Sequence, residues 1–218
     1  MGDSYIYKNQ KKLRWGYTTG TCAAAASLAA AVMLLRGRRM EQVSLTTPKG
    51  VRLDLEVEEM ETGKNCVCCG VRKDAGDDPD VTDGLMVYSQ VRLPDADSGG
   101  AGDAREAGDA REAGDNTEAG DDRNACGDYV YEKDGLRLIL SGGVGVGRVT
   151  QCGLSCEVGK AAINPVPRQM IFEQVAGVCR ESGFKGVLSI EIRVPEALKV
   201  VMPTLEKVCT KGEPISLN

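Results

Sequence analysis

An alanine-rich run, CAAAASLAAAVMLL, is the feature that most constrains how this chain can fold. Alanine is the strongest helix former. The hydroxyls of Thr18, Thr19 and Thr21 can cap the start of a helix, and Gly37 can end it. The sequence therefore predicts a helix within residues 17–37. Because the run is shorter than the roughly 20 apolar residues that span a bilayer, we expect a buried helix and no membrane partner.

Short segments in which apolar and polar residues alternate predict strands over much of the remaining chain. Residues 41–63 alternate around the turn PKG, which indicates a two-stranded hairpin. The segment 73–84 should then connect two strands. The further predicted strands lie at 66–73, 85–93, 136–141 and 186–195.

A second helix is predicted at residues 169–183, where apolar side chains recur at the spacing of one helical face. The preceding segment INPVPRQ is expected to stay outside the helix because of its two prolines. Strands outnumber helices and do not alternate with them regularly. The predicted fold class is therefore α+β, with a mixed or antiparallel sheet packed against the alanine-rich helix and this second, amphipathic helix.

The segment 95–124 differs in character from its surroundings. Its hexad AGDARE occurs twice in succession and is followed by the altered copies AGDNTE and AGDDRN. A segment with so few apolar residues cannot bury enough surface to offset the entropy lost on folding. We interpret it as a disordered acidic insertion.

Composition excludes several classes of function. The 218-residue chain contains no histidine, which rules out Ser-His and Cys-His hydrolase schemes and removes the commonest metal ligand. Its net charge of -5 gives no electrostatic steering towards nucleic acid, so no such partner is expected. The nine cysteines are irregularly spaced, which fits reduced thiols, and no export signal is visible. We expect a cytoplasmic location.

The segment KDAGDDPDVTDG, residues 73–84, concentrates negative charge in one loop. Close carboxylates repel one another, so such a loop either lies open to water or accepts a cationic or hydroxyl-rich group. Its spacing fits an EF-hand poorly, and a Ca²⁺ or Mg²⁺ site stays as an alternative, as do plain Asx turns in solvent. The candidate residues are Asp74, Asp77, Asp78, Asp80 and Asp83.

Three further features are candidates for binding. The start of the alanine-rich helix can attract anions through its free N–H groups, with Arg14 nearby in sequence, although ordinary capping is the plainer alternative. The glycines that follow residue 141 lack the spacing of a dinucleotide fingerprint and indicate tight turns, or a backbone loop against a flat ligand. The cysteines also lack zinc spacing, so buried structural thiols are expected at Cys66, Cys68, Cys69, Cys152 and Cys156.

Four strings of this sequence together resemble one protein family and occur in its order. They are LRWGYTTGTCAAAA, KDAGDDPDVTDG, GVGVGRVTQCGLSCEVGKAAINPVPRQMI and IEIRVPE. From about Leu13 to Glu196 the chain is similar to the CbiD family, the cobalt-precorrin-5B C(1)-methyltransferases of anaerobic cobalamin synthesis. The resemblance implies a CbiD-like N-terminal domain at 1–196 that contains the acidic insertion, a divergent tail at 197–218, and the absence of the family's C-terminal domain.

The resemblance implies transfer of a methyl group from S-adenosylmethionine to C1 of cobalt-precorrin-5B, giving cobalt-precorrin-6A. The sulfonium makes the donor methyl electrophilic, so the protein chiefly has to align donor and macrocycle and exclude water, and no histidine is required. Cobalt belongs to the substrate, and no protein-bound metal is expected. Two alternatives remain open: a truncated, non-catalytic corrinoid or S-adenosylmethionine binding module, and a divalent-metal protein that uses the acidic loop. The sequence indicates no oligomeric state.

Under this resemblance, site assignments follow from the charges of the two ligands. Carboxylates suit a cationic donor, so Asp74, Asp77 and Asp78 are placed beside it as the catalytic candidates, any one of which could serve as a base. Donor binding is further assigned to Asp80 and to the glycines Gly142, Gly143 and Gly145. The carboxylate arms of the macrocycle require hydrogen-bond donors, and the expected substrate-binding residues are Arg14, Thr18, Thr19, Thr21, Asn164 and Arg168.

Overall fold

The computed structural model describes six parts of the chain, and for the first two it describes the backbone alone. These parts are residues 5–8, 11–14, 16–77, 80–94, 128–151 and 156–197. Four features for which the sequence made predictions therefore lie outside the described residues: the acidic insertion at 95–124, Asp78, Cys152, and the tail after residue 197. The predicted domain boundaries stay predictions.

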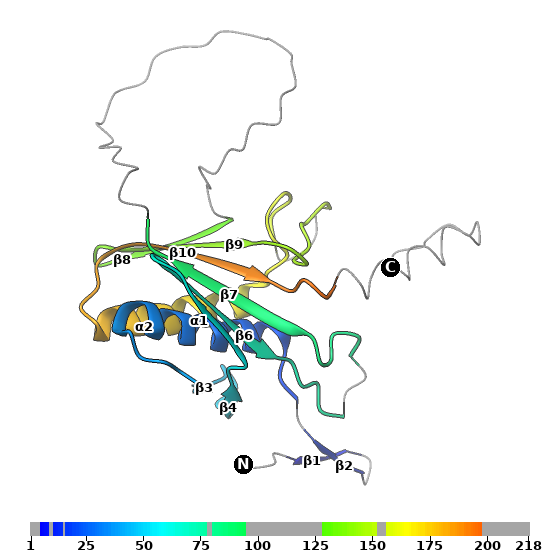
Figure 1. The fold of residues 1–218 in the computed structure, drawn as a ribbon. Coiled ribbons are helices and arrows are strands. Elements are labelled where there is room, and N and C mark those ends of the chain that lie inside the picture. Colours follow the sequence, from blue (N-terminus) through cyan, green and yellow to red (C-terminus); the bar gives the residue numbers. More distant parts are fainter. Residues whose placement is uncertain are drawn as a thin grey trace, which may run out of the picture.

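The described residues form two helices and ten strands (Figure 1). In chain order they are β1 (Tyr5–Lys8), β2 (Lys11–Arg14), α1 (Thr19–Arg36), β3 (Gln42–Thr46), β4 (Arg52–Glu56), β5 (Glu59–Thr62), β6 (Cys66–Arg72), β7 (Met86–Arg92), β8 (Tyr129–Lys133), β9 (Leu136–Gly142), α2 (Pro165–Glu181) and β10 (Gly186–Arg193).

One six-stranded sheet carries the fold, in the order β5-β6-β7-β10-β9-β8. Strand β10 runs parallel to β9, and the other neighbouring pairs are antiparallel. The pairs β1-β2 and β3-β4 form two separate antiparallel hairpins. The predicted α+β class with a mixed sheet is confirmed.

Helices α1 and α2 lie side by side against one face of the sheet, and they run in the same direction (Figure 1). Near their starts, Gly20 packs so closely on Pro167 that a Cβ would overlap the proline ring. Near their ends, the Arg36 guanidinium donates to the Glu181 carboxylate at 2.6 Å. The core lies between this pair of helices and the sheet, where the sheet contributes buried side chains such as Leu138 and Ile190.

Helix α1 is buried because its small side chains allow close contact with the sheet and with α2. By length and composition α1 could also cross a membrane, but 61% of it is buried inside the protein, as expected for a core helix. Its one buried hydroxyl in mid-helix, Ser27, has two partners: the carbonyl of Ala23 at 2.7 Å and the hydroxyl of Ser89 on β7 at 2.8 Å. The predicted buried helix, capped by Thr18 and ended by Gly37, is confirmed.

Two predictions about secondary structure were wrong. The segment INPVPRQ does not stay outside the second helix, because α2 begins at Pro165. Proline fits the first turn of a helix, where the missing N–H would have had no partner within the helix. The segment 41–63 holds three strands, since β3 and β4 form the predicted hairpin while β5 joins the large sheet beside β6.

The topology brings both helix starts and several strand ends to one end of the sheet. Gly142, which ends β9, pairs with Ile192 near the end of β10. Arg193, which ends β10, pairs with Tyr88 near the start of β7, and α2 leads back to β10 through a short connection at its far end. We call this edge the helix-start end; among the described residues it comprises 16–21, 73–77, 80–84, 142–147 and 164–168.

Candidate functional site

The helix-start end brings together segments that the sequence singled out separately (Figure 1). The Tyr17 N–H, just before α1, donates to the carbonyl of Asp74 in the acidic loop at 2.7 Å. On the other side, a Cβ on Gly142 would meet the Ala161 side chain a few residues before α2. The acidic loop, the start of α1, the glycine turn and the start of α2 therefore border one region. The backbone of Arg14 lies in β2, opposite Tyr5, and its side chain is outside the description.

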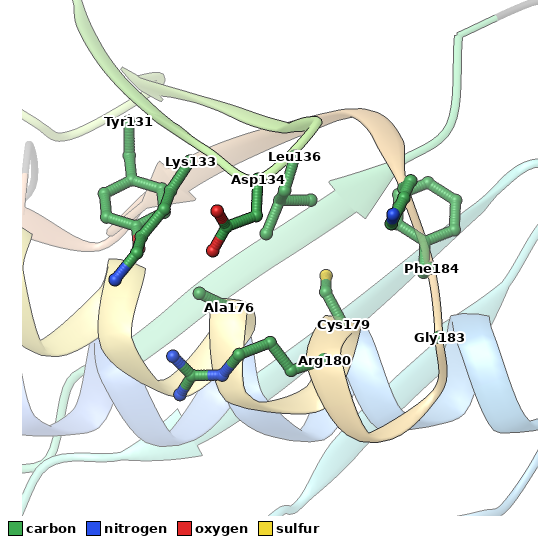
Figure 2. A pocket seen from close by; sticks show the side chains of 10 residues that line it. Tyr131, Lys133, Asp134, Leu136, Ala176, Cys179, Arg180, Gly183 and Phe184 are labelled. Atoms are coloured by element: carbon green, nitrogen blue, oxygen red, sulfur yellow. The ribbon is translucent and has the colours of Figure 1, made fainter.

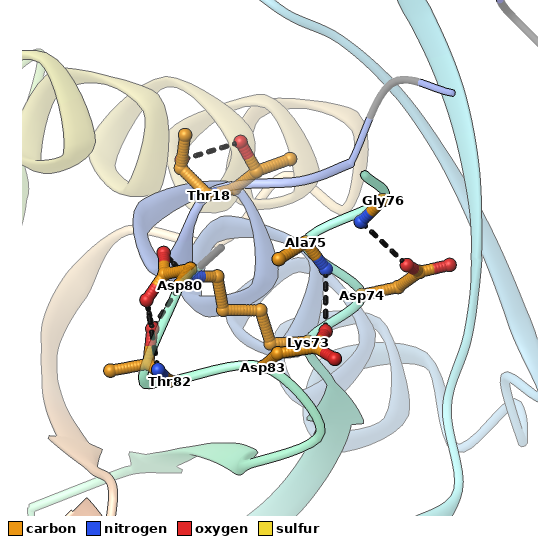
Figure 3. Close-up of polar contacts among 9 residues, drawn as sticks. Thr18, Lys73, Asp74, Ala75, Gly76, Asp80, Thr82 and Asp83 are labelled. Atoms are coloured by element: carbon orange, nitrogen blue, oxygen red, sulfur yellow. Dashed lines mark hydrogen bonds and ion pairs between the residues drawn. The ribbon is translucent and has the colours of Figure 1, made fainter. Parts of the chain in front are cut away.

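The acidic loop is built around a buried lysine (Figure 3). Only 3% of the Lys73 side chain is exposed, and its Nζ donates to the Asp80 carboxylate and, at 2.5 Å, to the Thr82 hydroxyl. Thr82 in turn donates its N–H and its hydroxyl to Oδ1 of Asp80. The hydrogen bond from Lys73, followed by those from Thr82, holds the pKa of Asp80 well below its usual range. Asp80 therefore stays ionised as the partner of a buried cation.

Two other carboxylates of the loop accept backbone hydrogen bonds. Asp83 accepts from the N–H of Ala75 at 2.7 Å, and Asp74 accepts from the N–H of Gly76 at 2.8 Å in an Asx turn (Figure 3). The loop is pressed against the segment before α1, because a Cβ on Gly16 would overlap the backbone of Ala75. The Asx turns that were the plainest alternative for this loop are therefore present. Asp77 is exposed.

The start of α1 is capped by its own residues. The Thr18 hydroxyl accepts from the N–H of Thr21 at 3.2 Å, and the two hydroxyls lie 3.0 Å apart. Thr21 is buried and Thr19 is half-buried. Beside them, burial raises the pKa of the Cys22 thiol to about 12. This thiol is protonated at neutral pH, so it is not a nucleophile.

The glycine turn after β9 is explained by packing within the protein. Gly145 has a φ of +79°, and a Cβ there would overlap the carbonyl of Val194 beyond β10. A Cβ on Gly143 would overlap the Glu191 side chain, and the Gly143 N–H donates to the Ile192 carbonyl at 2.9 Å. These contacts match the predicted tight turns. Donor binding by Gly142, Gly143 and Gly145 stays a prediction.

The start of α2 differs from that of α1. Asn164 occupies the N-cap position but makes no capping hydrogen bond. Pro165 and Pro167 lack N–H groups, so the first turn has few donors to cap. The Arg168 guanidinium lies over the ring of Tyr129 on β8, 4.0 Å from the centroid. Arg168 thus belongs to a contact between α2 and the edge strand.

This contact borders a pocket of about 740 Å³ between α2 and β8. Tyr129 and Lys160 line the pocket beside Arg168, and the sequence reasoning identified neither of them. Strand β8 begins at Tyr129, a few residues after the acidic insertion, and was not predicted. The alternation YVYEK was the signal that could have revealed it.

The cysteines are free thiols in the described part of the chain. Cys69 and Cys156 are buried, whereas Cys66 and Cys68 are half-buried. Burial raises the pKa of Cys69 to about 12, which is typical of an inert core thiol. Among the described residues, no group of three or more Cys, Asp, Glu or His side chains could hold a metal ion.

Comparisons with known proteins place this arrangement in context. The family model named CbiD matches residues 6–105 and 96–212. A cobalt-precorrin-5B C(1)-methyltransferase of Ruminiclostridium cellulolyticum is 39% identical over 202 residues, which is 93% of this chain and 42% of that protein. The enzyme of the same name from a Thermoanaerobacter species is 42% identical over 200 residues, which is 92% of this chain and 43% of that protein.

A solved structure also resembles the chain. The 1.9 Å crystal structure of the cobalamin biosynthesis protein cbiD from Archaeoglobus fulgidus matches with a TM-score of 0.53 and 27% sequence identity. The match covers 94% of this chain and 52% of that one. The chain thus spans less than half the length of the two methyltransferases and about half the length of the solved structure.

Proposed function

The chain belongs to the CbiD family, and from that premise we propose that it supplies part of the site where a methyl group passes from S-adenosylmethionine to C1 of cobalt-precorrin-5B. One observation carries the proposal. The acidic loop, the glycine turn and both helix starts lie at one end of the sheet, although 146 positions in the numbering separate Thr19, which begins α1, from Pro165, which begins α2. The cobalt-bearing macrocycle and the methyl donor would meet there.

The acidic loop is our candidate for the donor side. S-adenosylmethionine carries a sulfonium, an ammonium and ribose hydroxyls, all of which carboxylates favour. Asp80 is ionised but accepts a hydrogen bond from Lys73, and Asp83 accepts one from the Ala75 N–H, so both carboxylates stabilise the conformation of the loop. Asp77 is exposed, so a ligand can reach its carboxylate. We keep Asp74, Asp77 and Asp78 as the catalytic candidates, with Asp80 in support of donor binding.

The two helix starts are our candidates for the substrate side. The macrocycle carries acetate and propionate arms, which need hydrogen-bond donors and positive charge. The helix dipole of α1, with no acidic residue in its first turn, favours anions near Thr18, Thr19 and Thr21. Asn164 and Arg168 supply polar groups at α2, and Arg14 stays a candidate on sequence grounds.

The proposed reaction asks little acid–base chemistry of the protein. The carbon nucleophile of the macrocycle attacks the donor methyl, a carbon–carbon bond forms, and the carbon–sulfur bond breaks to leave a neutral thioether. The protein has to hold the two reactants in line and exclude water. The absence of histidine is compatible with this chemistry.

The test is an anaerobic incubation with cobalt-precorrin-5B and methyl-labelled S-adenosylmethionine. It uses the chain alone, the Ruminiclostridium relative, and the chain fused to the part of that relative which the chain does not match. We expect label to enter the macrocycle with the fusion. A fusion that folds and binds both ligands, yet transfers no label under conditions where the relative does, would sink the proposal. Binding without transfer would instead favour a non-catalytic binding module.

A further inference from the structure

The pocket between β8 and the first half of α2 has the size and lining of a small-molecule site. Its volume of about 740 Å³ falls within the roughly 300–1,000 Å³ typical of such sites. The rings of Tyr131 and Phe172 stack along it with centroids 5.7 Å apart, and Tyr129 lines the end nearest the start of α2. An apolar ligand body would be desolvated against these rings.

The acidic side chains of this pocket are already engaged. Asp128 is 8% exposed and accepts from the Arg148 guanidinium at 2.8 Å and from the Gly142 N–H at 3.1 Å. Glu173 accepts from the amide of Gln169 at 2.7 Å. Arg148 offsets the charge of Asp128, whereas the Gln169 amide is neutral and leaves the charge of Glu173 in place.

The cations of the pocket are less well matched. Arg168 forms no ion pair with any residue in the described ranges, and its buried Nε has no hydrogen-bond partner there. The Lys160 ammonium lies over the same Tyr129 ring, 5.5 Å from the centroid, and its own partner Glu157 is exposed. Two cations held over one ring create a positive potential that an anion would relieve.

Tyr129 positions these cations. Its hydroxyl donates to the carbonyl of Ala161 at 2.7 Å, which fixes the ring under Arg168. Burial raises the pKa of Tyr129 to about 12, so the phenol stays neutral and adds no negative charge. The guanidinium is therefore held over the ring, and the half-buried Arg168 keeps hydrogen-bond donors that a carboxylate could accept from.

We propose that this pocket binds carboxylate arms of the macrocyclic substrate, with Arg168 as the principal charged contact and Lys160 as the second. The proposal rests on the proposed function and adds a basis for selectivity: the chain should prefer a corrinoid with free carboxylates over one whose arms are amides. It also separates the charges, because the anionic arms bind beside β8 while the acidic loop lies beyond β7 on the same end of the sheet.

A second pocket on the same helix provides a matched control (Figure 2). It has a volume of about 180 Å³, below the usual range for ligand sites, and lies at the opposite end of α2 beside Lys133 and Arg180. Arg180 likewise forms no ion pair among the described residues, but Asp134 lines the same pocket. Arg168→Gln and Arg180→Gln therefore remove the same charge from the same helix.

The experiment titrates the whole chain with dicyanocobyrinic acid, whose arms are free carboxylates, and with dicyanocobinamide, whose arms are amides. Absorbance of the bound corrinoid gives the Kd. We expect the wild type to bind cobyrinic acid more tightly than cobinamide. Arg168→Gln should raise the Kd for cobyrinic acid about tenfold and leave the Kd for cobinamide nearly unchanged. Lys160→Gln should weaken acid binding by a smaller factor. Arg180→Gln should have the same Kd values as the wild type.

Thermal unfolding of each variant checks that it is folded. Arg168→Lys keeps the positive charge, so its Kd for cobyrinic acid should lie between those of the wild type and Arg168→Gln. Unchanged acid binding in both Arg168→Gln and Lys160→Gln would overturn this inference and leave the proposed function standing. An equal loss in Arg180→Gln would also overturn it, since charge alone would then explain the effect. Failure of both corrinoids to bind the wild type would overturn the inference together with the proposed function.

Discussion

The acidic loop and the pocket between α2 and β8 differ in how much of their charge is available to a ligand. The loop holds five aspartates within twelve residues, yet Asp80 pairs with a buried lysine and Asp83 accepts a backbone N–H. The pocket is lined by two acidic and two basic side chains, and one of the cations, Arg168, lacks an ion pair among the described residues. Local charge density therefore does not measure binding capacity, because the chain's own buried donors and acceptors are satisfied first.

The largest effect that tests this comparison should come from Gly16→Ala. A Cβ there overlaps the backbone of Ala75, which cannot move without displacing the acidic loop. We expect a loss of about 3 kcal/mol in the free energy of unfolding, measured by urea denaturation. Gly84→Ala is the control in the same loop, since Gly84 has a φ of +75° but open space around it, and should cost about 1 kcal/mol. Equal losses would mean that the loop does not depend on this contact.

The next effect concerns the lysine inside the loop. Asp80→Asn leaves the buried Lys73 ammonium without its carboxylate and should destabilise the protein by about 2 kcal/mol or more. Lys73→Met removes the buried charge and leaves Asp80, which is 37% exposed, to be solvated, so it should cost about 1 kcal/mol. Chemical denaturation at neutral pH measures both. The reverse order would contradict a loop organised around its buried cation.

The same pair sets a dependence of stability on pH. The pKa of Asp80 is lower in the folded protein than its ordinary value of 3.8, so its contribution is fully present above about pH 4 and is lost as the pH falls towards the folded value. Asp80→Asn lacks this contribution. The gap in unfolding free energy between wild type and Asp80→Asn should therefore narrow as the pH falls below about 4. A gap that is constant from pH 7 to pH 3 would show that Asp80 acts without its charge.

The smallest effect compares the two helix starts. Thr18→Ala removes a hydroxyl that accepts the Thr21 N–H, and should cost about 1 kcal/mol. Asn164→Ala removes no capping bond and faces a first turn with two prolines, so it should cost only a few tenths of a kcal/mol. Thermal unfolding of the two variants side by side measures the difference. If Asn164→Ala lost as much stability as Thr18→Ala, the Asn164 side chain would have to cap α2, contrary to the structure.

Local sequence patterns predicted most of the fold because they determine most of it. The alanines, the capping threonine and Gly37 defined α1, and the strands predicted at 66–73, 85–93, 136–141 and 186–195 match β6, β7, β9 and β10. The prediction was wrong at INPVPRQ because the rule against prolines in helices was applied to a first turn, where it does not hold. It missed β8, which begins at Tyr129 a few residues after the acidic insertion, although YVYEK alternates.

The candidate site was less predictable because contacts between distant residues create it. No spacing rule places Arg168 over Tyr129, since 39 positions separate them in the numbering and the β8-β9 hairpin brings them together. The partner of Asp80 was readable in principle, because the loop contains a single lysine, Lys73, but the burial of that lysine was not. The resemblance of several long sequence strings, in the same order, identified the CbiD family, which helix, strand and turn patterns alone could not identify.

The most direct test of the central claim, that ligands bind at the helix-start end, is hydrogen–deuterium exchange of the chain with and without S-adenosylmethionine and dicyanocobyrinic acid. We predict slower exchange in residues 16–21, 73–84 and 142–147 and around 164–168, with no change at the opposite end around 133–136 and 182–186. Binding that instead protects the opposite end, and leaves the helix-start end unchanged, would contradict the claim.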